Sequence, residues 1–280
     1  MNALRTTILL LVIACLASSA WAASWSAIDF PGAANTYAWG VSPGGNVVGS
    51  YDVSGDPVIH GFLLSSGVFA TIDYPGASAT YARGMNTAGT ICGYYFDGAD
   101  VVHSFVSDTV NYTLLDFPGA TETLAVSIND SGDVVGFFLD ASNVAHGFKW
   151  SGGTFTEIAV PGTDVVIYGI NNNGFIFGSL VDDHNVGHKF LRNPQGVVRY
   201  VNAGVALLYA GPNDHNTVVG ELTRRRGSDV IRWNITTKSS GTIHIPDSIH
   251  DHGTGVNDGG VVVGYYDDFH RVNHGFIWRP

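Results

Sequence analysis

The sequence predicts an all-β fold, a six-bladed β-propeller with four antiparallel strands in each blade. Three observations support this prediction. One unit of roughly 40 residues, the length of a propeller blade, recurs six times; each copy divides into four strand-like segments; and the two chain ends are complementary pieces of one copy. The composition agrees, because 36 glycines in 280 residues, with abundant Val, Ile, Phe and Tyr, favour strands joined by tight turns.

A glycine within an apolar strand provides the ruler for the repeat. It recurs at Gly49, Gly93, Gly136, Gly178, Gly220 and Gly264, at a spacing that suits a four-stranded blade. Upstream of each ruler glycine, a turn begins with Ser42 in the first copy and with Asn86, Asn129, Asn171, Asn213 or Asn257 in the others. We expect these residues to form type I turns between the first and second strands, because most of these turns carry Asn first and Gly last.

The second copy illustrates the expected strands. The first covers Tyr81–Asn86, the second covers Thr90–Tyr95, and the third begins at His103. The fourth strand, seen in the first copy as the run ending at Tyr74, precedes a Pro-Gly pair typical of a type II turn. A large apolar residue follows each third-strand start and should fill the space between blades: Phe62, Phe105, Phe148, Phe190, Ile231 and Phe276.

The chain ends bear on ring closure. Trp25–Phe30 reads as a fourth strand with no blade before it, and His274–Trp278 reads as a third strand with no fourth strand after it. We therefore expect the N-terminal strand to complete the last blade, which removes a large exposed sheet edge. An open β-solenoid would explain the repeat period but not these complementary ends.

Residues 1–22 read as a secretory signal peptide, which leaves residues 23–280 as the propeller domain. Arg5 supplies the positive charge, Ile8–Ala17 is a short apolar stretch, and Ala20–Ala22 is an A-x-A cleavage site. A stretch of about 10 apolar residues is too short to cross a bilayer, and no second apolar segment follows, so we expect no transmembrane segment. The predicted location is extracellular or periplasmic. A minor alternative is a lipoprotein anchored at Cys15, which follows Val12-Ile13-Ala14.

The recurring His-Gly-Phe at residues 60–62, 146–148 and 274–276, joined to a Gly-x-Asn-x-x-Gly turn, resembles the HAF repeats of bacterial extracellular proteins. The resemblance extends over essentially the whole predicted mature chain, although His-Gly or His-Ser stands where His-Ala is more usual. It implies a secreted repeat protein and carries no defined activity or catalytic residues.

Histidines open the third strand in five copies: His60, His103, His146, His188 and His274. Equivalent residues of neighbouring blades lie too far apart to share one ion, so we expect each to hydrogen-bond a neighbouring loop or blade. Asp97, Asp140, Asp182 and Asp268 should likewise start the turns ahead of these histidines. His250 and His252 form a possible metal pair without a third ligand. We therefore predict no metal site and no cofactor.

The fifth and sixth copies break the symmetry. Arg224, Arg225 and Arg226 form the only basic cluster and could clamp a carboxylate or sulfate of a ligand. Together with Tyr209 and His252, these arginines are the candidate ligand-binding residues. The sequence contains no zinc-protease helix, P-loop or dinucleotide fingerprint, and no catalytic residue is assigned.

The first hypothesis for function is an exported, non-catalytic module that binds an extracellular ligand, polysaccharide or partner. The second is an extracellular polysaccharide lyase or hydrolase with its site at the channel mouth near blades five and six. The third is a purely structural envelope protein. The net charge of −11 makes nucleic acid an unfavourable partner, and we expect a monomer.

Overall fold

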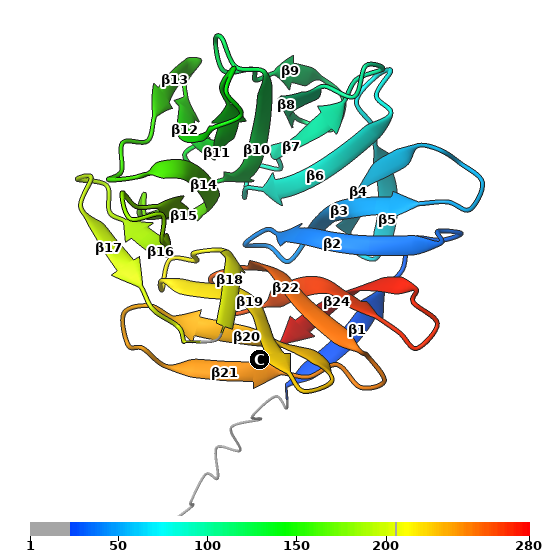
Figure 1. Cartoon of the computed structure of the whole chain (residues 1–280). Coiled ribbons are helices and arrows are strands. Elements are labelled where there is room, and N and C mark those ends of the chain that lie inside the picture. Colours follow the sequence, from blue (N-terminus) through cyan, green and yellow to red (C-terminus); the bar gives the residue numbers. More distant parts are fainter. Residues whose placement is uncertain (1–22, 205) are drawn as a thin grey trace, which may run out of the picture.

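A computed structural model describes residues 23–204 and 206–280 of the chain (Figure 1). These residues form strands and loops and contain no helix. The strands pair antiparallel in groups of four, which we call repeat units, and single parallel bridges at Ile59–Ala79 and Ser228–His250 join two pairs of these groups into eight-stranded sheets.

The repeat units have the following bounds. Unit 1 is β2 (Asn35–Val41), β3 (Val47–Asp52), β4 (Ile59–Ser65) and β5 (Val68–Ile72). Unit 2 is β6 (Ala79–Met85), β7 (Ile91–Phe96), β8 (Val102–Ser107) and β9 (Tyr112–Leu114). Unit 3 is β10 (Glu122–Ile128), β11 (Val134–Leu139), β12 (Ala145–Ser151) and β13 (Thr154–Glu157). Unit 4 is β14 (Thr163–Ile170), β15 (Ile176–Val181), β16 (Gly187–Arg192) and β17 (Val198–Val201). Unit 5 is β18 (Ala206–Ala210), β19 (Thr217–Arg224), β20 (Gly227–Asn234) and β21 (Ser240–Ile243). Unit 6 is β22 (His250–Val256), β23 (Val262–Asp267) and β24 (Asn273–Arg279), with β1 (Ser24–Ile28) as its fourth strand.

Strand β1 pairs antiparallel with β24, from Ser24 opposite Arg279 to Ile28 opposite Gly275. This pairing agrees with the prediction made from the chain ends. The strand stops before the expected Phe30, because the backbone N–H of Phe30 donates to Thr36 Oγ1 at 3.0 Å instead of continuing the ladder.

The first strand of each unit faces a common centre (Figure 1). Each of these strands contains a register shift that leaves one residue unpaired. A bulge of this kind re-aims the extra side chain. The bulge residues are Trp39, Arg83, Val126, Tyr168, Tyr209 and Thr254. These residues differ from unit to unit, so they give each unit a different side chain near the axis.

The core lies between neighbouring units. The predicted phenylalanine position is fully buried in five units, and Ile231 occupies it in unit 5 at 5% exposure. Cys92 is fully buried on β7 and packs in one cluster with Leu115 and with Ala125 of unit 3. This apolar filling fixes how one unit sits against the next.

The turn asparagines link the units through their side-chain amides. In each such turn the Oδ1 atom accepts the backbone N–H four residues later, as in Asn86 with Thr90 at 3.0 Å. The Nδ2 group donates to the turn carbonyl of the next unit. The donor–acceptor pairs are Asn86–Asn129, Asn129–Asn171, Asn171–Asn213, Asn213–Asn257 and Asn257–Ser42, at 2.9 to 3.3 Å. The last of these joins unit 6 to unit 1.

Candidate functional site

Three polar side chains from units 5 and 6 meet beside the axis. His252 Nδ1 on β22 lies 2.8 Å from Glu221 Oε2 on β19. The hydroxyl of Tyr209, the bulge residue of β18, lies 3.3 Å from the same His252 nitrogen and 3.5 Å from Glu221 Oε2. The structure therefore brings together two of the predicted ligand-binding residues, Tyr209 and His252, and adds a carboxylate that sequence reasoning did not select.

Strand alternation explains how Glu221 reaches this position. It directly follows the ruler glycine Gly220, and the equivalent residues of the six units are Ser50, Tyr94, Phe137, Ser179, Glu221 and Tyr265. Glu221 is the only carboxylate in this set, so an alignment of the copies at the ruler glycine would have found it.

The environment sets the protonation of this cluster. Burial lowers the pKa of His252, against the charge of Glu221, which raises it. Burial also raises the pKa of Tyr209, and the charge of Glu221 adds to that effect. At neutral pH the cluster therefore holds a neutral imidazole and a phenol that can donate a hydrogen bond.

An aromatic wall continues from this cluster into unit 1. The His252 ring stacks on Tyr265 with centroids 4.5 Å apart, and Tyr265 meets Trp39 edge-on at 5.5 Å. Tyr37 lies parallel to Trp39 at 5.8 Å, and the Arg83 guanidinium sits 4.4 Å above the Trp39 ring. The wall is partly exposed and thus open to a ligand that offers flat apolar faces.

Unit 3 shows the contrast. Its residues at the positions of Tyr37, Trp39 and Tyr265 are Leu124, Val126 and Phe137. None of these side chains can donate or accept a hydrogen bond. The axis therefore has a polar, aromatic sector in units 5, 6, 1 and 2 and an apolar sector in unit 3.

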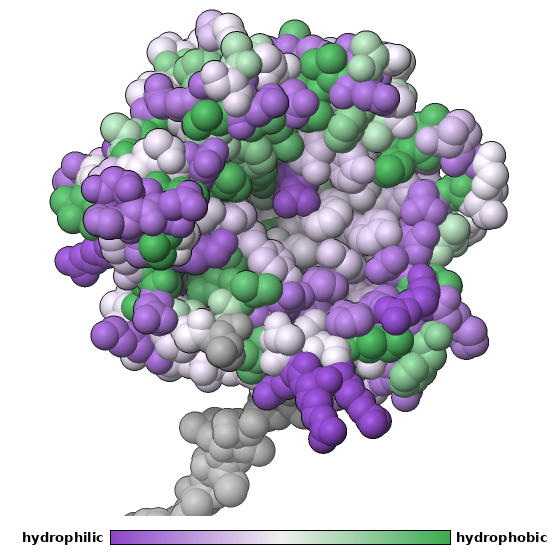
Figure 2. Space-filling model, viewed as in Figure 1, coloured by the Kyte–Doolittle hydropathy of each residue, from purple (hydrophilic) through white to green (hydrophobic). Residues whose placement is uncertain are grey.

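The axis opens into a cavity of about 110 Å³ that residues of all the units line. The lining includes the bulge residues Trp39, Arg83, Val126, Tyr168 and Thr254, whereas Tyr209, Glu221, His252 and Tyr265 are not part of it. The molecule is hollowed at the centre of the face seen in Figure 2. A second hollow of about 390 Å³ lies between units 3 and 4, beside Lys149 and Arg192.

One end of the axis carries a second set of contacts between turns. In units 2 to 5 the backbone N–H of the residue that follows the turn asparagine donates to the equivalent side chain of the next unit. The acceptors are Asp130, Asn172, Asp214 and Asp258, at 2.7 to 2.8 Å. Burial, followed by the charge of Asp214, raises the pKa of Asp258. These carboxylates act as acceptors between units, and sequence reasoning missed this role.

The arginine cluster lies away from the axial cluster. Arg224 ends β19 three residues after Glu221, roughly 10 Å along the strand, and points to its opposite face. There it pairs with Asp229 Oδ2 at 2.6 Å. Arg225 and Arg226 are exposed in the turn between β19 and β20. The structure thus does not join these arginines to Tyr209 and His252 in one site.

The repeated histidines are held by carboxylates on two sides. In units 1, 2, 3 and 6 the Nδ1 atom lies 2.7 to 3.0 Å from an acid at the end of the fourth strand; the pairs are His60–Asp73, His103–Asp116, His146–Glu157 and His274–Asp29. The Nε2 atom faces an aspartate of the preceding loop, and His188 of unit 4 keeps only this second contact, to Asp182 at 2.7 Å. His250 pairs with Asp267 at 2.9 Å and so does not join His252 in a common site.

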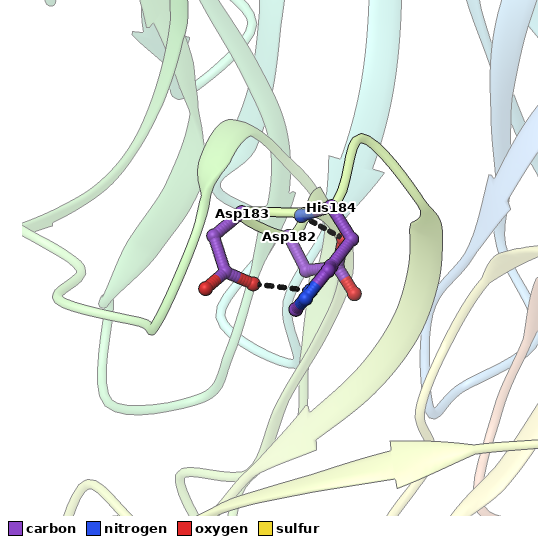
Figure 3. A group of neighbouring side chains, drawn as sticks. All are labelled: Asp182, Asp183 and His184. Carbon is purple, nitrogen blue, oxygen red and sulfur yellow. Dashed lines mark hydrogen bonds and ion pairs between the residues drawn. The ribbon is translucent and has the colours of Figure 1, made fainter.

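The loop between β15 and β16 gathers Asp182, Asp183 and His184 (Figure 3). His184 Nδ1 lies 2.7 Å from Asp183 Oδ1, and both side chains are largely exposed. Asp182 Oδ1 already accepts the backbone N–H groups of His184 and Val186 at 2.9 Å. The group is therefore an exposed turn whose carboxylate is used locally, as expected for the aspartates of these loops.

No protein-family model matches the sequence, and no curated protein matches it. Solved structures share its fold at low identity. TolB from Acinetobacter baumannii has a TM-score of 0.57 and 11% identity over 74% of this chain and 52% of the TolB chain, so this chain spans about half of that protein. The β-propeller domain of the Trilobed protease from Pyrococcus furiosus has a TM-score of 0.52 and 11% identity over 87% of this chain and 95% of the domain.

The chain is an all-β propeller. A variant of Aleuria aurantia lectin in complex with Fucα1-6GlcNAc is also similar, with a TM-score of 0.51 and 10% identity over 87% of this chain and 91% of the lectin. At these identities the likeness extends to the propeller fold and not to the ligand.

The predicted signal peptide and the alternative lipidation site Cys15 lie outside the described residues. Within the described part of the propeller, no helix has the length and hydropathy to span a membrane.

Proposed function

We propose that the protein is an exported six-bladed propeller that binds an extracellular saccharide at the polar, aromatic sector of its axis, without catalysing a reaction. Six repeat units, the pairing of β1 with β24 and the amide link from Asn257 to Ser42 support a closed ring. The candidate signal peptide and the HAF-like repeats support a periplasmic or extracellular location.

The aromatic wall carries the proposal. Saccharide rings combine apolar faces with a rim of hydroxyl groups, so they are recognised by aromatic faces with nearby hydrogen-bonding groups. Tyr265 and Trp39 offer partly exposed aromatic rings, Glu221 offers an acceptor, and the Arg83 guanidinium, which lies over Trp39, offers donors. The propeller of the Aleuria aurantia lectin was solved with a disaccharide, so a related architecture accommodates such a ligand.

A glycan array probed with the labelled protein tests this proposal. We expect binding to a subset of glycans and, for Tyr265→Ala, an apparent affinity lower by at least about 10-fold, as for loss of a central aromatic contact. The matched control is Phe269→Ala, which removes an aromatic residue that is 71% exposed in the β23–β24 loop. Equal loss in both variants, or binding that survives Tyr265→Ala in a folded protein, contradicts the axial site.

The cluster of Tyr209, Glu221 and His252 favours a second candidate, a polysaccharide lyase or hydrolase. A neutral imidazole beside a carboxylate and a phenol can accept and deliver protons. Release of product from a bound glycan would support this function, provided that Glu221→Gln retains binding and loses turnover. If neither binding nor product release is found across the array, the structural envelope role replaces both candidates.

A further inference from the structure

Unit 5 reverses a pair that units 1, 2, 3 and 6 keep. Where units 1, 2, 3 and 6 have histidine on the third strand and an acid at the end of the fourth, unit 5 has Asp229 on β20 and His244 after β21. Asp229 Oδ1 lies 3.2 Å from His244 Nδ1, so the contact persists with its partners exchanged. Asp229 is opposite Leu222, as His103 is opposite Tyr95, which confirms that the positions are equivalent.

Asp251 of unit 6 is a second departure beside this pair. The equivalent residues of units 1 to 3 are Thr36, Thr80 and Thr123, whose hydroxyls each accept a backbone N–H from the preceding loop at 3.0 Å. Asp251 Oδ2 keeps that role, because it accepts the N–H of Ile245 at 3.0 Å. The change from threonine therefore adds a second oxygen and a charge, neither of which this backbone contact requires.

The added oxygen has no partner. Asp251 has 0% exposure, and its Oδ1 atom is buried without a hydrogen bond among the described residues. Complete burial disfavours an isolated negative charge at this position. A buried carboxylate of this kind needs a compensating cation or donor.

The three side chains lie close together, and the Asp251 atom that faces His244 is Oδ2, the oxygen that also accepts the Ile245 N–H. His244 Nδ1 lies 3.2 Å from Asp229 Oδ1 and 3.6 Å from Asp251 Oδ2, and one ligand atom from each residue fits within 4.8 Å of the others. Ligand atoms about 2.0 to 2.2 Å from a tetrahedral zinc ion lie about 3.3 to 3.6 Å from one another. The two separations from His244 Nδ1, 3.2 Å to Asp229 and 3.6 Å to Asp251, are close to these values.

We propose that Asp229, His244 and Asp251 bind one divalent transition-metal ion of the Zn²⁺ class between units 5 and 6. Two carboxylates and one imidazole form a mixed oxygen and nitrogen set that suits such an ion, and its charge compensates the buried Asp251. Arg224 donates to the other oxygen of Asp229 from Nε at 2.7 Å and orients that carboxylate from outside the site. His244 is 64% exposed, so the fourth position faces solvent and is open to water.

Calorimetric titration of the metal-stripped full chain with Zn²⁺ tests the site. We expect one equivalent to bind and to raise the melting temperature. Asp251→Thr restores the residue of units 1 to 3, with its acceptor for Ile245, so this variant should fold. Both Asp251→Thr and His244→Ala should weaken zinc binding by more than about 10-fold. Loss of an outer-sphere partner alone typically costs about that much, and these variants remove a ligand. Arg224→Gln removes the outer donor that orients Asp229 and should also weaken zinc binding, by less than either of these two variants.

The control is His184→Ala, which disrupts the exposed group of Asp182, Asp183 and His184 and should leave zinc binding unchanged. Zinc binding that persists at wild-type affinity in both Asp251→Thr and His244→Ala overturns the site, because the ion then binds elsewhere. Absence of any one-equivalent binding in the wild type also overturns it and leaves only an ion pair between His244 and Asp229.

Discussion

Units 2 and 5 make the same outer contact with opposite residues. In unit 2, His103 on β8 lies 2.7 Å from Asp116, and its ring stacks on Tyr95. In unit 5, Asp229 on β20 faces His244 at 3.2 Å, and Leu222 replaces the tyrosine. Units 2 and 5 therefore share a histidine–aspartate contact between the third strand and the end of the fourth, although the two residue types have exchanged positions.

The comparison separates two kinds of departure from the repeat. The exchange in unit 5 is compensated, because the third strand gains an aspartate where it loses the histidine and the segment after the fourth strand gains a histidine where it loses the acid. Glu221 and Asp251 are uncompensated, because each introduces a carboxylate where the other units have a neutral residue. Uncompensated charges within a repeat cost stability unless a ligand or ion uses them, and they identify the sites proposed above.

Deletion of residues 24–28 is expected to give the largest effect, since unit 6 is equivalent to the other units only with β1 as its fourth strand. The deletion exposes the edge of β24 and removes the buried Ile28. Thermal unfolding followed by circular dichroism should lose its cooperativity, or size-exclusion chromatography should show chains that exchange strands. A form that begins at Ala23 is the control. A stable, monomeric deletion variant with unchanged melting would show that closure does not depend on β1.

The interior position that is phenylalanine in five units and Ile231 in unit 5 gives the next effect. Phe148→Ala should lower the free energy of unfolding by about 3–5 kcal/mol, because it leaves a cavity in a fully buried site. Ile231→Val should cost only about 0.5–1.5 kcal/mol. Urea titrations of both variants measure the difference, with an unchanged slope as the control for two-state unfolding. Equal costs would contradict the cavity argument, because Phe148→Ala removes a much larger buried group than Ile231→Val.

The amide links between turns should be worth less. Asn129→Ala leaves the carbonyl of Asn171 and the N–H of Asp133 without these partners and should cost about 1–3 kcal/mol. Asn129→Ser copies Ser42, whose hydroxyl still accepts a turn N–H, and should cost less. Conversely, Ser42→Asn adds a donor toward unit 2 and should stabilise the protein by about 0.5–1.5 kcal/mol. Destabilisation by Ser42→Asn would show that unit 1 lacks room for the amide.

The smallest expected effect is on pH dependence. Burial lowers the pKa of His103, but the hydrogen bonds and charges of Asp116 and Asp97 outweigh burial and raise it. The resulting stabilisation is complete below the ordinary histidine pKa of about 6.5 and is lost as pH rises through the higher folded-state value. The free energy of unfolding at pH 6 and pH 8 should therefore differ less in His103→Gln than in the wild type. The control is the exposed His184→Gln variant, in which the difference in unfolding free energy between pH 6 and pH 8 should match that of the wild type. A wild-type difference in His103→Gln would contradict the proposed contribution of His103 to the pH dependence.

Local sequence signals predicted much of the fold. The ruler glycine, the turn asparagines and the buried phenylalanines recur at fixed positions, so the strands and their order followed from one copy. The pairing of β1 with β24 followed from the two incomplete ends. Strand limits moved by a few residues, because cross-strand hydrogen bonds and not residue type decide where a ladder stops.

The candidate sites were predicted less well, because they combine residues from different units. Tyr209 and His252 were selected because they break the repeat, but their contact through Glu221 depends on which side chains face the axis. The hydrogen bond from the Asn86 side-chain amide to the next unit was not predicted, because the role of Asn86 within its own turn already explained why asparagine stands there. Asp251 alone does not indicate a metal site in the sequence, because the other two candidate ligands, His244 and Asp229, approach it only in the folded chain.

Cys92 can serve as a natural probe of local opening between units 2 and 3. Burial raises the pKa of this thiol to about 12, so the reactive thiolate is nearly absent while units 2 and 3 remain packed. In protein that begins at Ala23, a thiol reagent can modify the chain only when that junction opens. The labelling rate under native conditions therefore reports how often two neighbouring sheets part, without any engineered reporter.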